Sequence, residues 1–198
     1  VERTEFAAED LTIPAFGTQP LTLVLRNWTT QPRRWKASAD QPWIRLGAAS
    51  GTVNDRADLP LTLEGSALKE GAAVTGTVTV TDVATGKPRT VSIAAAVVRP
   101  VDIAADSTIF NVTAETSEQR KFTVINRTRQ EQDWKIDFDR PWMKTVPAGG
   151  KLAPGGMAAV TVTAAPPADE PVLHETALTL TSASGKARSV VPLHVFVI

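Results

Sequence analysis

The chain has 198 residues, of which 42% are hydrophobic and 21% charged, and its 21 basic residues balance 21 acidic ones, so the formal net charge is zero. That balance disfavours a nucleic-acid surface, which needs a basic excess, and the absence of cysteine excludes a disulfide framework, a thiolate metal site and a cysteine nucleophile. The apolar content is too high for a disordered chain. The sequence also has no uninterrupted apolar run of about 18 residues, the length that would predict a membrane span.

The sequence contains an internal repeat. Leu11–Leu63 aligns without a gap with Phe110–Val162, and the shared positions include Asn-x-Thr, Trp-Lys, Asp-x-Pro-Trp and a later glycine. After one adjustment the tails align as well: Val78 and Val80 with Leu178 and Leu180, and Gly86-Lys87 with Gly185-Lys186. We therefore expect two copies of one fold, residues 1–99 and 100–198, joined near Arg99-Pro100.

Alternation of apolar and polar residues predicts β-strands throughout. In chain order it marks residues 59–64, 77–81, 134–138 and 178–181 and a terminal strand over 190–198. Turn-forming residues separate these runs at 17–20, 84–87, 147–150 and 154–156, and residues 67–70 form one helical turn at most. The sequence therefore predicts an all-β chain of two tandem immunoglobulin-like β-sandwiches with about seven strands each.

Two tryptophans at equivalent positions are expected in the two cores. Trp35 and Trp134 each fall on the inward phase of a predicted strand. The inward positions after Trp134 hold Ile136 and Phe138, whereas the first copy has alanine at both. Because interiors are close-packed, another side chain must fill that volume, and Trp28 and Phe16 are the candidates.

The recurring string of Trp, Asp-x-Pro-Trp and Gly resembles the BACON domains of bacterial surface and secreted proteins, and the related repeats of the ASPM/SPD-2/hydin type. The second copy is the closer match, while the first replaces the Pro-Gly-Gly turn with residues 54–58. The resemblance implies a seven-stranded immunoglobulin-like sandwich, often in tandem, in exported multidomain proteins. It also implies either carbohydrate binding or a spacer role beside other domains.

Trp28 is the candidate ligand-binding residue, because it follows a strand end and has no counterpart in the second copy, where Arg127 stands. The alternative is that it packs at the edge of the sandwich. The tryptophans of the two Asp-x-Pro-Trp strings, Trp43 and Trp142, could stack on sugars, but a repeated turn whose tryptophan enters the core is the favoured interpretation. Asn-x-Thr at 27, 111 and 126 fits a glycosylation pattern or an ordinary turn.

Charged residues give weaker signals. The run Arg33–Lys36 favours an outward strand face over nucleic-acid binding. The aspartates at 55, 58, 133, 137 and 139 could supply oxygens to calcium, but their spacing does not match a calcium-binding loop. His174 and His194 are too few for a zinc site. We therefore expect no metal site and no cofactor. Without a catalytic motif, we expect no catalytic residues and no enzyme.

Three functional hypotheses follow. The first is a non-catalytic interaction or spacer module of a larger exported bacterial protein, extracellular or periplasmic, contacting a carbohydrate or another domain of its parent, with neither nucleic-acid binding nor membrane insertion. The second is a carbohydrate-binding module that uses Trp28. The third is a strand-accepting or strand-donating assembly module, favoured by the apolar terminal segment Val195–Ile198. The oligomeric state stays open.

Overall fold

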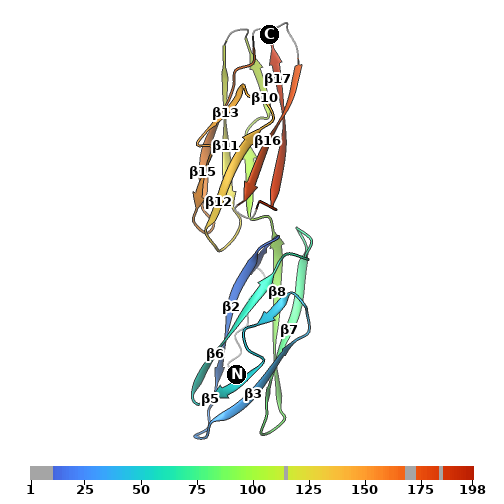
Figure 1. The fold of residues 1–198 in the computed structure, drawn as a ribbon, viewed down its shortest axis with the longest axis vertical. Coiled ribbons are helices and arrows are strands. Elements are labelled where there is room, and N and C mark those ends of the chain that lie inside the picture. Colours follow the sequence, from blue (N-terminus) through green and yellow to red (C-terminus); the bar gives the residue numbers. More distant parts are fainter. Residues whose placement is uncertain (1–10, 114–115, 168–172, 183–184) are drawn as a thin grey trace. The chain divides into compact units, whose positions relative to one another are not determined.

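The computed structural model describes residues 11–113, 116–167, 173–182 and 185–198, and the chain divides into two compact units, Val1–Val98 and Arg99–Ile198. Every regular element in those ranges is a β-strand (Figure 1). Within them, no helix has the length and apolar character needed to cross a membrane. Each unit is an immunoglobulin-like β-sandwich, so the predicted fold class is confirmed.

Unit 1 contains a five-stranded sheet and a three-stranded sheet. Their orders are β1-β8-β7-β3-β5 and β2-β6-β4. The eight strands are β1 (Thr12–Pro14), β2 (Thr18–Arg26), β3 (Arg33–Ala39), β4 (Ile44–Leu46), β5 (Ser50–Val53), β6 (Arg56–Glu64), β7 (Ala73–Asp82) and β8 (Pro88–Val98).

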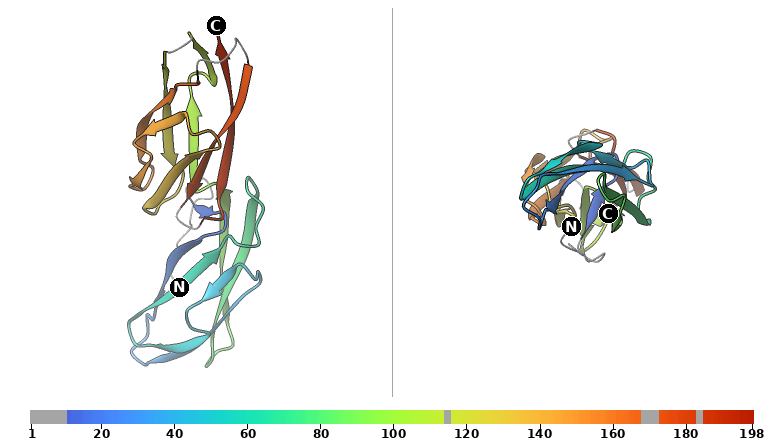
Figure 2. Two further views of the ribbon diagram at one scale, coloured as in Figure 1. Left: turned by 45° about the horizontal axis from the view of Figure 1, so that its top comes forward. Right: turned by 90° about the horizontal axis from the view of Figure 1, so that it is seen from below.

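Unit 2 contains a five-stranded and a four-stranded sheet, ordered β10-β17-β16-β12-β14 and β13-β15-β11-β9. Two views of the ribbon show the two layers in each unit (Figure 2). The nine strands are β9 (Val101–Ala105), β10 (Ile109–Val112), β11 (Glu118–Asn126), β12 (Gln132–Phe138), β13 (Met143–Val146), β14 (Gly149–Leu152), β15 (Met157–Ala164), β16 (Leu173–Ser182) and β17 (Arg188–Val197).

Each unit has more than the seven strands predicted, because short strands of three or four residues lack a long alternating run. These are β1, β4 and β5 in unit 1 and β10, β13 and β14 in unit 2. Two predicted turns also move. Thr18–Pro20 belongs to β2, so the first turn centres on Phe16, whose φ is +62°. Gly149 and Gly150 begin β14. Residues 67–70 form turns without a helix.

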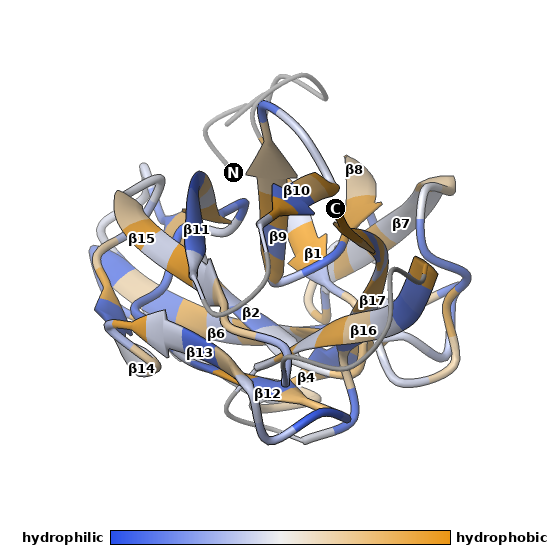
Figure 3. Ribbon diagram, turned by 90° about the horizontal axis from the view of Figure 1, so that it is seen from above, coloured by the Kyte–Doolittle hydropathy of each residue, from blue (hydrophilic) through white to orange (hydrophobic). Residues whose placement is uncertain are grey.

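The core of each unit is built from the alternating strand faces. Apolar and polar residues alternate along the strands (Figure 3). In unit 1 the inward faces of β6 and β7 supply Leu59, Leu61, Leu63 and Val78, all with relative exposures of 2% or less. Trp35 and Trp134 are both buried, as predicted, and each belongs to the apolar cluster of its own unit.

The prediction that Trp28 or Phe16 fills the volume left by the two alanines of β3 is wrong. Trp28 is 75% exposed and Phe16 46% exposed. The side chain that joins the unit 1 core instead is Trp43, which is 7% exposed and clusters with Ala37 and Ala39. Its turn brings it inward over Gly76 of β7, a residue without a side chain to oppose it.

The terminal segment of the chain is paired on both sides. β17 lies between β16, with which it is antiparallel, and β10, with which it is parallel. Val195 and Val197 are buried, and the N–H of Ile198 donates to the carbonyl of Val112 at 3.0 Å. This pairing removes the observation that favoured strand donation by residues 195–198, because donation would break two existing ladders.

Candidate functional site

The loop that carries Trp28 is held in place by the asparagine before it. The side-chain amide nitrogen of Asn27 donates to the carbonyls of Gln31, Val53 and Asn54 at 2.7, 3.3 and 2.7 Å. Its oxygen accepts the N–H and the hydroxyl of Thr29 at 3.0 and 2.7 Å. The Asn-x-Thr motif therefore ties the β2–β3 connection to the β5–β6 connection and fixes where the intervening residue points.

Unit 2 contains the same hydrogen-bonded Asn-x-Thr arrangement. Asn126 is 1% exposed, and its amide nitrogen donates to the carbonyls of Gln130, Leu152 and Ala153 at 2.7, 3.1 and 2.9 Å. Thr128 completes it through its N–H and hydroxyl, each 2.8 Å from the Asn126 oxygen. Of the two interpretations of the motif at 27 and 126, the structure supports a turn, because both amide nitrogens already donate to carbonyls.

A cleft of about 350 Å³ opens at the end of unit 1 where β2 ends and β3 begins. We call it the Trp28 cleft. Residues from β2, β3, β5, β7, β8 and the connections between them line it: Leu25, Arg26, Asn27, Trp28, Thr29, Arg33, Arg34, Trp35, Val53, Val80, Asp82, Thr85, Lys87 and Arg89. Five of these side chains are basic and one is acidic, so the lining is strongly positive in a chain of zero net charge.

Trp28 presents its indole to solvent at the mouth of this cleft. Because its side chain is 75% exposed, the ring does little for the core. The guanidinium carbon of Arg26 lies 5.8 Å from the ring centroid, within the range of a cation–π contact. Arg26 therefore lies over one face of the indole and limits the positions that the ring takes.

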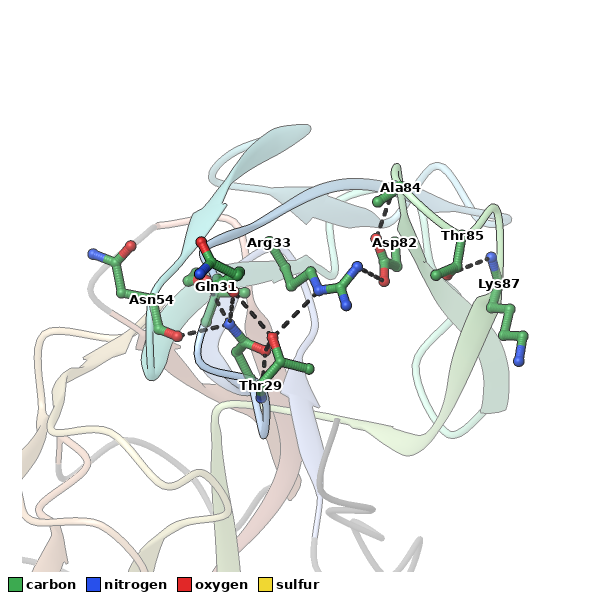
Figure 4. Close-up of polar contacts among 10 residues, drawn as sticks. Thr29, Gln31, Arg33, Asn54, Asp82, Ala84, Thr85 and Lys87 are labelled. Carbon is green, nitrogen blue, oxygen red and sulfur yellow. Dashed lines mark hydrogen bonds and ion pairs between the residues drawn. The ribbon is translucent and has the colours of Figure 1, made fainter.

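A polar chain crosses the cleft and orders its arginine. Arg33 donates through Nε to the Thr29 hydroxyl at 3.3 Å, and its Nη1 lies 3.8 Å from Oδ2 of Asp82 (Figure 4). The N–H of Ala84, 2.9 Å from Oδ1, is the main cause that holds the pKa of Asp82 below its usual range, and Thr85 and Arg33 act in the same direction. The carboxylate is thus charged at neutral pH and holds Arg33 in place.

The remaining basic groups of the cleft are Arg34, Lys87 and Arg89, all exposed. Within residues 11–113, 116–167, 173–182 and 185–198, no ion pair to a carboxylate involves their side chains. These cations are available to an anion from solution.

The basic character is confined to unit 1. The strand register makes Lys87 and Arg89 equivalent to Ala187 and Ser189. The carbonyl of Lys87 accepts the N–H of Asp82, just as the carbonyl of Ala187 accepts that of Ser182, and Asp82 and Ser182 pair with the equivalent tryptophans of β3 and β12. The predicted match of Gly86-Lys87 with Gly185-Lys186 is therefore displaced by one residue, whereas Val78 and Val80 match as predicted. None of the positions in unit 2 that are equivalent to the five cations is basic. Arg26, Arg33, Arg34, Lys87 and Arg89 correspond in that order to Ile125, Gln132, Asp133, Ala187 and Ser189.

The surface of unit 2 at this position carries paired charges instead. Lys151 lies 3.1 Å from a carboxylate oxygen of Glu131 and 3.5 Å from one of Asp133. The hydrogen bond that Lys151 donates to the Glu131 carboxylate is the main cause that raises the pKa of Lys151 above its usual value. Arg127, which replaces Trp28, is 3.4 Å from Asp102. The two units thus share a frame but differ in the groups they offer to a ligand.

The Asp-x-Pro-Trp strings act structurally. Oδ1 of Asp40 accepts the N–H of Thr77 at 2.6 Å, and Oδ1 of Asp139 accepts that of Ala177 at 3.1 Å. Trp43 enters the core as expected, whereas Trp142 is half-buried and lies against His174, with ring centroids 5.4 Å apart. Across the described part of the chain, no three acidic or histidine side chains are grouped to hold a metal ion.

Sequence reasoning selected Trp28 but missed the basic residues around it. The sequence predicts Arg33 and Arg34 on an outward strand face and Lys87 in a hairpin turn, and it assigns no role to Arg26 and Arg89, because the five residues come from separate parts of the chain. Part of the signal is present in the repeat, where Arg26, Arg33 and Arg34 align with Ile125, Gln132 and Asp133 although total charge is balanced in each copy. Lys87 aligns with Lys186 in the sequence, and only the strand register shows that Ala187 takes its place.

The family model of the viral BACON domain matches the chain twice, over residues 3–97 and 101–193. The chain belongs to the BACON domain family. This confirms the resemblance stated from the sequence, and both units are BACON domains of immunoglobulin-like architecture. A comparison with curated proteins found no match.

Three similar solved structures share little sequence with this chain. The D0-D1 domain of intimin is 16% identical with a TM-score of 0.37, and the match covers 98% of each chain. The CupB2 chaperone of Pseudomonas aeruginosa is 11% identical with a TM-score of 0.38, over 93% of this chain and 96% of that one. PapD-like domain 7 of human CEP192 is 11% identical with a TM-score of 0.39, over 50% of this chain and 83% of that one.

Proposed function

We propose that the chain is a non-catalytic interaction module of a larger exported protein, in which the first BACON domain contacts a ligand through the Trp28 cleft and the second acts as a spacer. The observation that carries this proposal is the exposed indole of Trp28 beside a cleft of about 350 Å³. Small-ligand sites have volumes of roughly 300–1,000 Å³, and aromatic side chains commonly anchor what they bind.

Carbohydrate is the ligand class we propose for this module. A sugar ring offers a flat C–H face that packs on an exposed indole, and the hydroxyl of Thr29 and the guanidinium of Arg33 lie beside Trp28 to meet its hydroxyl groups. The second domain has Arg127 at the position of Trp28 and lacks this platform. A spacer role for that domain accords with its ion-paired surface around Lys151.

Affinity electrophoresis in gels containing a series of polysaccharides tests the proposal. At least one polysaccharide should retard the full chain, and Trp28→Ala should migrate as it does in a gel without polysaccharide. Arg127→Ala provides the matched control in the second domain and should be retarded like the wild type. A chain whose mobility no polysaccharide changes, or whose retardation survives Trp28→Ala, would contradict a carbohydrate site at Trp28.

A further inference from the structure

The geometry of the Trp28 cleft points to an anionic saccharide: we infer that the site binds a carboxylated or sulfated sugar residue, with the ring on Trp28 and the anionic group on Arg34, Lys87 and Arg89. This inference rests on the proposed function and adds the chemical class of the ligand. Among the described residues, five basic groups and one carboxylate line this cleft, in a chain whose total charge is balanced.

Asp82 is the one carboxylate among the described residues of the lining, and it does not neutralise Arg34, Lys87 and Arg89. Asp82 lies 3.8 Å from Arg33 and is held by the N–H of Ala84, so its charge is directed to one arginine. Arg34, Lys87 and Arg89 come from β3, from the β7–β8 connection and from β8, and all three side chains are exposed. Like charges brought together by separate strands repel one another, and a bound anion would relieve that repulsion.

Trp28 indicates that the anion is attached to a ring. Its indole is already approached by Arg26 at 5.8 Å, and 75% of its side chain stays open to solvent. A free inorganic anion would gain nothing from this surface, whereas a sugar ring would bury part of it. Guanidinium groups in turn bind carboxylate and sulfate through paired N–H donors, which gives directional recognition.

The cluster is too confined for a nucleic-acid strand. Single-strand binding needs a basic groove that follows the phosphates over several nucleotides. Here the positions equivalent to the five cations in the second domain are all non-basic, and one of them is Asp133. The volume of about 350 Å³ lies at the lower end for small-ligand sites and suits one or two sugar rings.

Titration calorimetry of the full chain with matched charged and neutral probes tests this inference. The pairs are tetragalacturonate with its methyl ester, and sialyllactose with lactose; a ten-residue oligothymidylate and an octaglutamate peptide represent the other polyanions. We expect at least one acidic saccharide to bind at least about tenfold more tightly than its neutral partner. Raising the salt concentration from 50 to 500 mM should weaken that binding.

Four variants test the position of the site. Trp28→Ala and Arg34→Glu should each lower the affinity for the acidic saccharide by about tenfold or more. Lys121→Glu makes the same charge change at an exposed position of β11 in the second domain and should leave the affinity within about twofold. Arg89→Gln neutralises another cation of the cleft without reversing its charge. Circular dichroism shows whether each variant keeps its strand content.

The possible failures are distinguishable. Equal, Trp28-dependent binding of acidic and neutral saccharides would overturn the anionic preference and leave the proposed carbohydrate module intact. Absence of saccharide binding altogether would overturn both. Tighter binding of the oligothymidylate or of the acidic peptide would assign the cluster to another class of ligand and overturn the saccharide inference.

Discussion

A β-carbon on Gly76 would lie 3.1 Å from Cζ2 of the Trp43 indole, so the absence of a side chain on β7 is what lets this tryptophan into the core of unit 1. The equivalent residue on β16 is Thr176, whose hydroxyl donates to Asp139, and there the tryptophan of the turn, Trp142, is half-buried. One glycine therefore accounts for the different placement of two tryptophans in repeated turns.

Replacing Gly76 by threonine, its equivalent in unit 2, should destabilise unit 1 by roughly 1–3 kcal/mol, the usual cost of overpacking. The added atoms would meet Ile44 as well as Trp43, with a β-carbon only 2.6 Å from Cδ1 of Ile44. Hydrogen exchange of the full chain, resolved by peptide, should show faster exchange in unit 1 and unchanged exchange in unit 2. Ser38→Thr, at an exposed position of β3, is the control and should leave both units unchanged.

The equivalent glycines Gly51 and Gly150 should respond differently to replacement by alanine. A β-carbon on Gly51 would lie 2.7 Å from Cζ2 of Trp35, whereas one on Gly150 would lie 3.5 Å from Nε1 of Trp134, an ordinary contact. Gly51→Ala should therefore lower the free energy of unfolding of unit 1 by about 1–3 kcal/mol. Gly150→Ala should be neutral or raise that of unit 2 by up to about 1 kcal/mol, because alanine restricts the unfolded chain. Equal effects in the two units would contradict this difference in packing.

The repeat is visible in the residues that the two halves share, and periodicity was enough to predict the sandwiches and the burial of Trp35 and Trp134, since these depend on local alternation. Contacts between distant strands were outside its reach. Nothing near Trp43 in the sequence shows that Gly76, more than thirty residues later, makes room for it. The sequence therefore offers Trp28 and Phe16 for the volume left by the two alanines of β3, and both are exposed. The Trp28 cleft was missed for the same reason, because its cations converge from separate strands only in the folded chain.

The Asn-x-Thr motifs offer a test of a buried polar group. Asn126→Ala would leave the carbonyls of Gln130, Leu152 and Ala153 without their donor, and we expect unit 2 to lose roughly 3 kcal/mol of stability. Asn111 belongs to the same sequence motif but is exposed, so Asn111→Ala should change stability by less than about 0.5 kcal/mol. Urea unfolding of the full chain followed by tryptophan fluorescence provides the measurement; similar losses in both variants would show that the hydrogen bonds of Asn126 contribute little.

The two tryptophans beside the cleft should separate binding from stability. Trp28→Ala removes a ring that is 75% exposed, and we expect the free energy of unfolding of unit 1 to stay within about 0.5 kcal/mol. Trp35→Ala removes a buried ring that also lines the cleft, and it should lower the free energy of unfolding of unit 1 by about 3–5 kcal/mol. Acrylamide should quench less of the remaining fluorescence in Trp28→Ala than in the wild type. Destabilisation by Trp28→Ala as large as that by Trp35→Ala would mean that Trp28 packs in the fold.

Asp139 should make unit 2 sensitive to acid. The hydroxyl of Thr176 is the main cause that lowers the pKa of Asp139, and the N–H of Ala177 adds to it. A carboxyl whose pKa is lower in the folded state stabilises the fold above its unfolded pKa of about 3.9, and that contribution is lost as the pH falls through the folded pKa. Because Asp139 is exposed, solvent screens the contribution, which we expect to be about 1 kcal/mol or less.

Asp139→Asn should therefore weaken unit 2 at pH 7, and the difference from the wild type should shrink as the pH is lowered from about 4 toward 2. Hydrogen exchange of peptides from β16, corrected for the intrinsic pH dependence of exchange, measures this difference within the full chain. Asp137→Asn is the charge-matched control, since Asp137 is an exposed aspartate of β12 that pairs with Lys135 at 2.6 Å. A difference between wild type and Asp139→Asn that stays constant down to pH 2 would show that the hydrogen bonds at Asp139 do not depend on its charge.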